Sequence, residues 1–120
     1  MNVISVAART LADRAVEAAR TLTRNGEAID DHQVVVERVA YAATEARVIA
    51  ELADVPASLA AFAQVAAAEL ALSLRNRLEP VAALLGLGEL RYDDAAREAI
   101  ASGLASFATT TPRARRSRLR

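Results

Sequence analysis

The sequence contains no cysteine, no lysine, no tryptophan and only one histidine among its 120 residues. The lack of cysteine excludes disulfides, thiolate nucleophiles and cysteine-ligated metals, and it fits a reducing interior. A single histidine excludes a cluster of histidine metal ligands. Aromatic residues make up 3% of the chain, beside four glycines and three prolines, so signals for strands and tight turns are few.

Alanine supplies a quarter of the chain, and β-branched residues are scarce outside the run Val34–Val36. Because alanine has the highest helix propensity, this composition predicts an all-helical protein. The length allows one domain with a hydrophobic core. All fifteen basic residues are arginine, which we interpret as the codon usage of a GC-rich bacterial genome.

The net charge of zero conceals two regions of opposite sign. Residues 1–108 carry ten arginines and fifteen acidic residues, whereas residues 109–120 carry five arginines and no acid. We therefore predict a helical bundle domain over 1–108 and a flexible or partner-bound Arg-rich tail over 109–120. The tail lacks the aromatic residues that stack on bases and the body is acidic, so a specific nucleic-acid reader is not expected.

The first half of the chain predicts two helices. One runs from about Val3 to Thr23 and ends at Asn25 and Gly26, which tolerate the left-handed conformation of a helix C-terminus. The second begins near Asp30 or Asp31, whose carboxylates suit unpaired first-turn N–H groups. The expected core positions are Ile4, Ala8, Leu11, Ala15, Ala18 and Leu22 in the first helix and Val35, Val39, Ala42, Ala46, Ile49 and Ala53 in the second.

The second half predicts two further helices. A third helix opens near Pro56 and is nearly apolar on every side from Leu59 to Leu74, so we expect it to be the most buried. Pro80 implies a kink or break near Arg77. Asp93 or Asp94 caps a fourth helix. Its apolar face is Ala96, Ile100, Leu104 and Phe107.

The apolar run from Val55 to Leu74 approaches the length of a membrane span. Gln64 and Glu69 within it, and an alanine-rich rather than leucine-rich composition, argue against a span. The first residues lack a basic start and are amphipathic, so no signal peptide is recognised. We therefore expect a cytoplasmic protein without a membrane partner.

Residues 25–33 read Asn-Gly-Glu-Ala-Ile-Asp-Asp-His-Gln, at the end of one helix and the start of the next. With Gly26, Ile29 and Gln33 at this spacing, the chain resembles the C-terminal helical domain of acyl-CoA dehydrogenases, flavoenzymes that remove two hydrogens from an acyl thioester. The likeness covers about residues 4 to 103. It includes the Leu-Leu-Gly-Leu-Gly segment at 84–88, where the family usually has an apolar pair and adjacent glycines.

The resemblance implies a four-helix domain that forms an oligomer core and contacts FAD shared with a partner subunit. It assigns Gln33 to the adenine end of FAD and Gly86 to the path of the adenosine and diphosphate. A flavin-contacting arginine of the family corresponds to Arg24 if the turn is two residues shorter, or falls on Leu22 without a gap. A surface glutamine explains Gln33 equally well.

The catalytic base of the family has no counterpart in this sequence. Many members use a glutamate after the last helices, but no acidic residue follows Glu98, and the aligned region reads Ser102-Gly103 or Thr110-Thr111. A hydroxyl without a partner base cannot abstract the α-proton of a thioester at neutral pH. No catalytic residue is assigned, and the chain is not expected to be active alone.

Several other residues have a structural explanation that we favour. His32 lies in a first helical turn as a solvated or capping side chain. The pairs Asp30-Asp31 and Asp93-Asp94 stand at helix starts, where capping accounts for them. Glu69 interrupts an apolar helix, so we expect it in a structural ion pair. The candidate partners are Arg38, Arg47 and Arg75.

The sequence thus predicts an antiparallel up-down four-helix bundle that resembles the acyl-CoA dehydrogenase C-terminal domain. One hypothesis is a non-catalytic or half-site subunit of a flavin-dependent dehydrogenase-like complex. The alternative is a helical assembly module that no longer binds flavin. Both require a homo-oligomer or a larger partner subunit, since few aromatics and much alanine leave apolar surface open.

Overall fold

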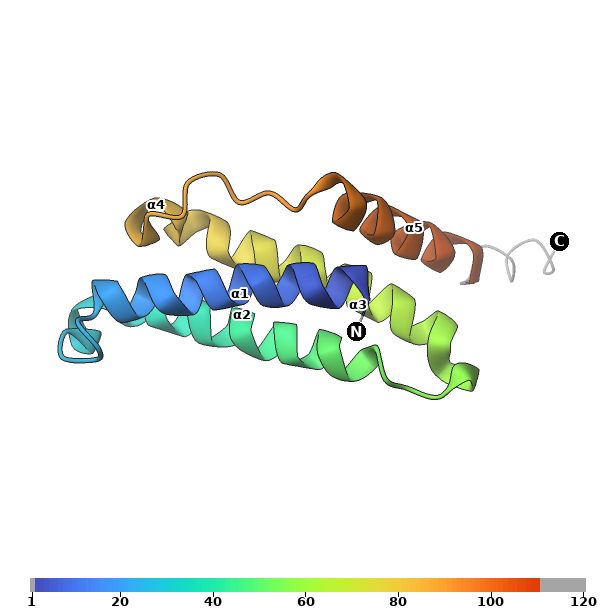
Figure 1. Cartoon of the computed structure of the whole chain (residues 1–120), viewed down its shortest axis with the longest axis horizontal. Coiled ribbons are helices and arrows are strands. Elements are labelled where there is room, and N and C mark those ends of the chain that lie inside the picture. Colours follow the sequence, from blue (N-terminus) through green and yellow to red (C-terminus); the bar gives the residue numbers. More distant parts are fainter. Residues whose placement is uncertain (1, 111–120) are drawn as a thin grey trace, which may run out of the picture.

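The computed structural model describes residues 2–110 of the chain (Figure 1). Its helices are α1 (Val3–Leu22), α2 (Gln33–Leu52), α3 (Ala60–Leu78), α4 (Ala82–Leu85) and α5 (Asp94–Thr110), with 3-10 turns at Ile29–His32, Ala57–Leu59 and Glu79–Val81. No strand occurs within residues 2–110, so the predicted all-α class is confirmed.

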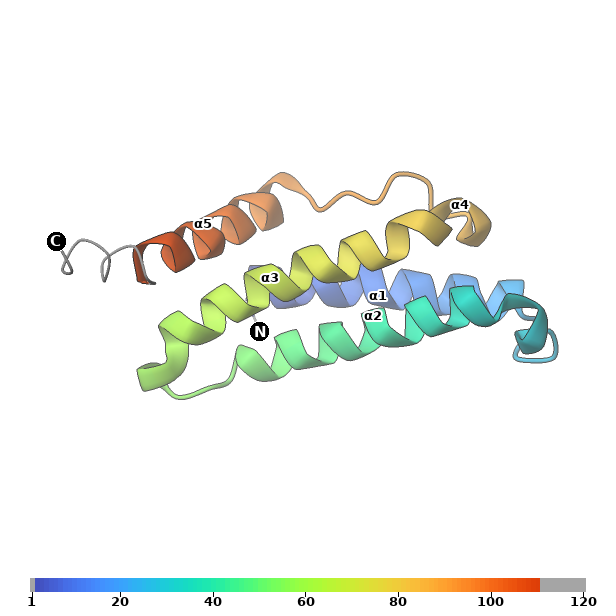
Figure 2. The same ribbon diagram turned by 180° about the vertical axis from the view of Figure 1, so that it is seen from behind.

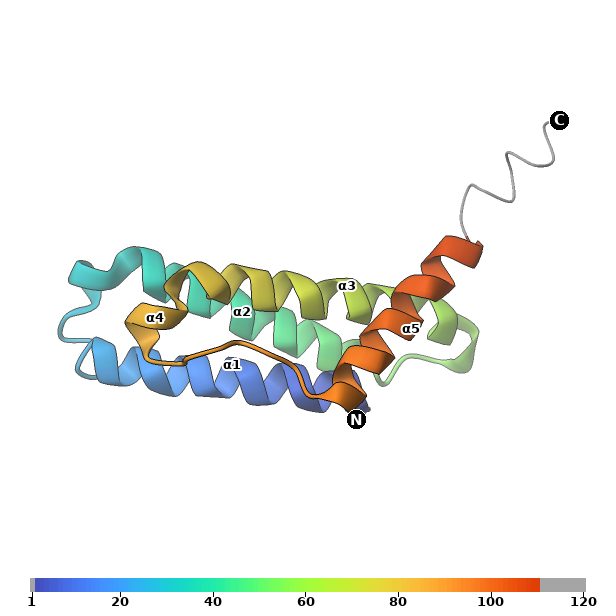
Figure 3. The ribbon, with the colours of Figure 1, turned by 90° about the horizontal axis from the view of Figure 1, so that it is seen from above.

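Helices α1, α2 and α3 lie antiparallel in chain order (Figures 1 and 2). The short α4 turns the chain at one end, and residues 86–93 then run back without helix between α1 and α3 (Figure 3). Helix α5 crosses α3 obliquely and ends at the same end of the molecule as the start of α3 (Figures 1 and 3). The place that a fourth long helix would fill in a four-helix bundle is therefore taken by the extended residues 86–93 and by α5.

Three hydrogen bonds attach the extended segment to the helices beneath it. Arg14 donates from Nη2 to the Leu87 carbonyl at 3.2 Å, and Arg75 donates from Nε to the Leu90 carbonyl at 3.0 Å. The Tyr92 ring is buried, and its hydroxyl donates to the Ala71 carbonyl at 2.6 Å. Burial raises the pKa of the Tyr92 hydroxyl far above its ordinary range, because the phenolate would lose its hydration.

Helix α1 begins and ends as its sequence predicted. The Asn2 side chain accepts a hydrogen bond from the Ser5 amide, and the Asn2 amide donates to the Ser5 hydroxyl, each at 2.9 Å, which forms a capping box. After the helix, three consecutive residues adopt positive φ: Arg24 at 53°, Asn25 at 59° and Gly26 at 98°. Four of the six expected core positions are buried, and Ala18 and Leu22 are partly buried.

The predicted capping of α2 by Asp30 or Asp31 is wrong. Both aspartates lie in the 3-10 turn Ile29–His32, and α2 begins at Gln33 without a side-chain cap. The left-handed turn after α1 is followed by this extra turn, so the helix starts two to three residues later than the aspartates indicated. Five of the six expected core positions of α2 are buried, Val35, Val39, Ala42, Ala46 and Ile49.

Helix α3 contacts α1, α2 and α5, in keeping with the expected central position, but six of its 19 residues are buried against seven of 20 in α1, so the prediction that it is the most buried helix is wrong. Where it begins, Leu59 of the preceding 3-10 turn is 51% exposed and Phe62 of α3 is 75% exposed. Within residues 2–110, one helical stretch, Ala57–Leu85, is long and apolar enough to cross a membrane by length and composition, and 28% of its most apolar window is buried in the fold. Apolar composition does not reveal which neighbours cover a helix.

The expected ion pair of Glu69 is also wrong. Glu69 is exposed on α3, and within residues 2–110 it pairs with no arginine. The three candidate partners bond elsewhere, Arg38 to the Arg77 carbonyl, Arg47 to Glu51, and Arg75 to the Leu90 carbonyl and Glu79.

The remaining helix boundaries agree with the sequence. Helix α3 gives way to a 3-10 turn at Glu79–Val81, around Pro80, and Gly86 ends α4 with a φ of 67°. Asp93 caps α5 by accepting from the Ala96 amide at 2.8 Å. Ala96 and Ile100 are buried and Leu104 is partly buried. The Phe107 side chain and the Arg-rich tail beyond residue 110 lie outside the described residues.

Candidate functional site

The three residues that the resemblance assigns to FAD belong to one end of the molecule. Arg24 follows α1, Gln33 is the first residue of α2, and Gly86 ends α4, and these elements meet at the same end (Figure 1). All three residues are exposed. They are therefore accessible to a partner, as the resemblance requires.

Of these three residues, Arg24 lines a groove at this end of the molecule. This groove of about 550 Å³ is lined by Glu17, Arg20, Thr21, Arg24, Asn25 and Glu27. Neither Gln33 nor Gly86 lines this groove, and its two glutamates oppose a diphosphate by charge. This groove by itself therefore does not suit a diphosphate, and the FAD contacts that the resemblance implies would need groups from a partner.

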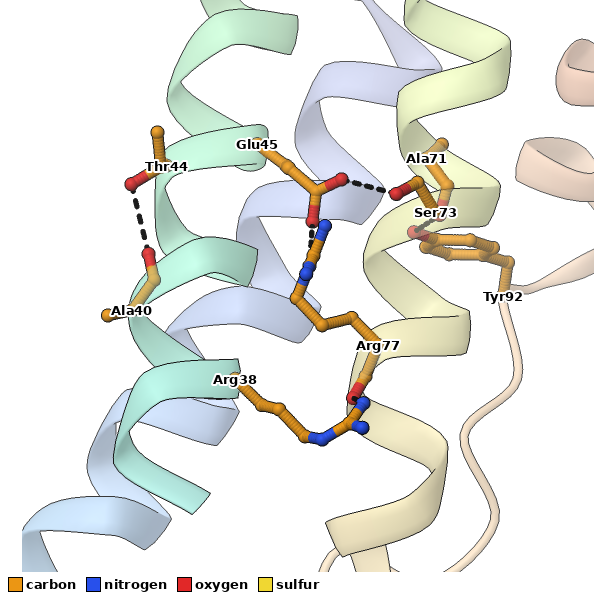
Figure 4. Close-up of polar contacts among 8 residues, drawn as sticks. All are labelled: Arg38, Ala40, Thr44, Glu45, Ala71, Ser73, Arg77 and Tyr92. Atoms are coloured by element: carbon orange, nitrogen blue, oxygen red, sulfur yellow. Dashed lines mark hydrogen bonds and ion pairs between the residues drawn. The ribbon is translucent and has the colours of Figure 1, made fainter. Parts of the chain in front are cut away.

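A polar cluster joins α2 and α3 (Figure 4). The Glu45 carboxylate accepts from the Ser73 hydroxyl at 2.5 Å and from Arg77 Nε at 2.7 Å. Arg38 donates from Nη1 to the Arg77 carbonyl at 3.0 Å, and the Arg77 guanidinium lies 5.1 Å from the centre of the Tyr41 ring. The Glu45 side chain is 12% exposed, so this is a half-enclosed and fully paired cluster.

The cluster is built for structure rather than for catalysis. The hydrogen bond that Arg77 donates to Glu45 raises the pKa of the guanidinium, so Arg77 stays charged. Both Glu45 oxygens already accept a donor, and a carboxylate held this way is a poor base for the Ser73 hydroxyl. The cluster fixes how α2 and α3 lie against each other.

Beside this cluster, α2 presents a row of exposed apolar side chains. Val34, Tyr41 and Val48 are spaced seven residues apart and are 66%, 52% and 42% exposed. Seven residues make almost two helical turns, so the three side chains lie on one line of the helix surface. We call these three residues the α2 stripe.

The other acidic and histidine residues carry no site within the described chain. Asp93 caps α5, and Asp94 forms an ion pair with Arg97 at 2.9 Å. Asp30 and Asp31 are exposed in the 3-10 turn, and His32 is half-buried after them. Among residues 2–110, no group of three acidic or histidine side chains could hold a metal ion.

No protein-family model, no curated protein and no solved structure gives a significant match to this chain. The candidate sites therefore rest on the residues and their geometry.

Sequence reasoning overlooked the α2 stripe, although a signal was present. The buried heptad of α2 begins at Val35, and a second apolar repeat of seven begins one residue earlier at Val34. A search for apolar residues at seven-residue spacing from every starting position in the helix would have found it. The contact of Glu45 with Ser73 and Arg77 had no such signal, because it depends on how α2 and α3 are aligned.

Proposed function

We propose that this chain is a helical assembly module that pairs with a second copy of itself through the α2 stripe. The observation that carries the proposal is the row of exposed Val34, Tyr41 and Val48 on an otherwise polar helix surface. The row is symmetric about Tyr41. A two-fold axis at this residue would set Tyr41 against its counterpart and Val34 against Val48 of the second copy.

The charges around the stripe suit this pairing. Arg38 and Glu45 flank Tyr41, and both are already bonded to groups of α3. Closing a second copy over Tyr41 would therefore leave neither of these side chains without a hydrogen-bond partner, and a buried polar group without a partner is costly at an interface. The stripe extends over about 21 Å of helix, a length that suits a weak, concentration-dependent dimer.

Sedimentation equilibrium of the full chain over a range of concentrations tests the proposal. Tyr41→Ser should raise the dimer dissociation constant at least tenfold, because a central tyrosine anchor is lost. Tyr41 also contacts Arg77, so Val34→Ser provides a second variant outside the polar cluster. Val6→Ser, at a valine of α1 that is 50% exposed, is the matched control.

Two results would contradict the dimer. The chain would be monomeric at all concentrations, or Val34→Ser would weaken association no more than Val6→Ser does. Circular dichroism of each variant would establish that helix content is unchanged.

A second function retains the family resemblance, and we propose it as the alternative. The chain would serve as a non-catalytic or half-site subunit of a flavin-dependent acyl-CoA dehydrogenase-like complex, its up-down four-helix bundle acting as oligomer core. The exposure of Arg24, Gln33 and Gly86 at one end supports this proposal, since a partner could reach all three. The partner would supply the base and the domains that cover the flavin ring.

Co-expression with a dehydrogenase-like chain tests this alternative. The copurified pair should retain flavin and lose it when Arg24→Ala is introduced, whereas the isolated chain should show no dehydrogenase activity with any acyl-CoA. Turnover by the isolated chain, or a pair free of flavin, would argue against it.

A further inference from the structure

The chain at the start of α3 carries a run of exposed, uncharged residues, 56–62. Residues 55–62, which we call the apolar tip, contain six apolar side chains besides Pro56 and Ser58, and no charged residue occurs between Asp54 and Glu69. Leu59 and Phe62 lie one helical turn apart and are 51% and 75% exposed. Isolated exposed apolar residues are ordinary, but a contiguous tip that includes an aromatic ring marks a contact surface.

The Arg-rich segment follows α5 in sequence, and α5 ends at this same end of the molecule. Helix α5 ends at the same end of the molecule as the start of α3 (Figures 1, 2 and 3), and the sequence then continues for ten residues beyond Thr110. Those ten residues contain Arg113, Arg115, Arg116, Arg118 and Arg120 and no acid. Ten residues span at most about 36 Å, so the arginines and the apolar tip can reach one common surface.

The charges of the described residues also differ between the two ends of the molecule. The opposite end, around the turn between α1 and α2 and the first turns of α2, exposes one arginine without an ion pair in the described chain, Arg24, against four such acidic residues, Glu27, Asp30, Asp31 and Glu37. Near the tip, Glu51 is paired with Arg47 at 3.1 Å, which leaves Asp54 as the unpaired carboxylate. An anionic surface would therefore attract the tip end and repel the other.

We propose that the apolar tip and the Arg-rich segment together bind the surface of an anionic lipid bilayer, with Leu59 and Phe62 entering the headgroup region. A polybasic segment and a short apolar insertion are each weak alone, and stable attachment to a membrane surface requires two such signals. Contact of this kind leaves the buried face of α3 packed against α1 and α2, so it differs from a membrane span, but it departs from the expectation of a protein without a membrane partner. It is also independent of the α2 stripe.

A single-tryptophan probe tests the insertion directly, because the chain contains no tryptophan of its own. Phe62→Trp in the full chain should shift its emission to shorter wavelength when vesicles containing phosphatidylglycerol are added, and not with phosphatidylcholine alone. Leu84→Trp is the matched control, since Leu84 is 63% exposed on α4 at the opposite end. Its emission should remain unchanged.

Vesicle sedimentation measures the two signals separately. Each tail arginine replaced by glutamine should weaken binding about fivefold, and high salt should reduce binding of the parent chain. Phe62→Gln should weaken binding roughly tenfold, because the inserted ring is lost. Leu84→Gln should bind like the parent.

Four outcomes would overturn the proposal. The full chain would not bind anionic vesicles, or the Phe62→Trp variant would bind them without any change in its emission, which would leave charge attraction by the tail alone. A shift in both the Phe62→Trp and the Leu84→Trp variants would indicate unfolding on the lipid. A shift of the Phe62→Trp emission with protein concentration in the absence of lipid would mean that a second copy covers the tip.

Discussion

Gly103 offers the sharpest test of how α5 is held on the bundle. A Cβ atom at this position would lie 2.8 Å from the Ala68 Cβ and 3.0 Å from the Gln64 carbonyl oxygen. Carbon atoms in ordinary contact lie about 3.5 to 4.0 Å apart. Neither colliding atom belongs to a flexible side chain, so Gly103→Ala must push α5 away from α3.

Two opposing terms decide the stability of Gly103→Ala. Alanine in place of a helical glycine stabilises by about 1 kcal/mol. Overpacking at a rigid contact destabilises by about 1–3 kcal/mol. Displacing α5 also uncovers part of the buried Ile100. We therefore expect a net loss of about 1 kcal/mol in the free energy of unfolding, measured by urea denaturation followed by circular dichroism.

A double-mutant cycle with Ala68→Gly isolates the contact. Removing the Ala68 methyl eliminates the 2.8 Å collision, so Gly103→Ala should cost about 1–2 kcal/mol less in that background than in the parent chain. Ser102→Ala, at an exposed neighbour on α5, reports helix propensity alone. If Gly103→Ala stabilises the chain as Ser102→Ala does, with no coupling to Ala68, then α5 does not cross α3 at this point.

The local signals in the sequence were sufficient for most helix boundaries. Apolar spacing found α1 and the buried side of α2, Asp93 acts as the cap of α5, and Gly86 ends α4 at positive φ. These features depend on residues within one or two turns of each other. Sequence alone can supply that information because the partners are close along the chain.

Features that depend on distant partners escaped prediction. The extended segment keeps its course because Arg14, Arg75 and Tyr92 bond to groups far away in sequence. Ser102-Gly103 had been aligned with a catalytic loop, yet Gly103 lies within α5 and allows its close approach to Ala68. A glycine signals backbone freedom or close contact, and only the neighbouring helix distinguishes the two.

Helix α3 shows that apolar composition also fails to predict which side of a helix is buried. Its sequence predicted the most buried helix, but Phe62 and Glu69 are both exposed. Hydrophobic periodicity locates a buried face only when polar residues mark the other face. Helix α3 has few polar residues, so neither its exposed side nor the apolar tip could be predicted.

Three further predictions concern single residues. Gly26→Val should destabilise by about 1–2 kcal/mol through backbone strain alone, since φ is 98° and a Cβ there would meet no atom within 4 Å. Glu45→Gln should cost about 1–3 kcal/mol in urea unfolding because charge-assisted bonds from Ser73 and Arg77 are weakened, and an unchanged midpoint would contradict the cluster. The last prediction concerns alkaline pH. Burial raises the pKa of Tyr92, so the unfolded chain loses this proton near pH 10 while the folded chain retains it. The unfolded state then binds fewer protons, and stability must fall as pH rises above that value, by at most about 1.4 kcal/mol per pH unit from this group. Tyr92→Phe should lower stability at neutral pH by about 1 kcal/mol, because the bond to the Ala71 carbonyl is lost, and should flatten the alkaline decline. An equally steep decline in Tyr92→Phe would show that another group titrates.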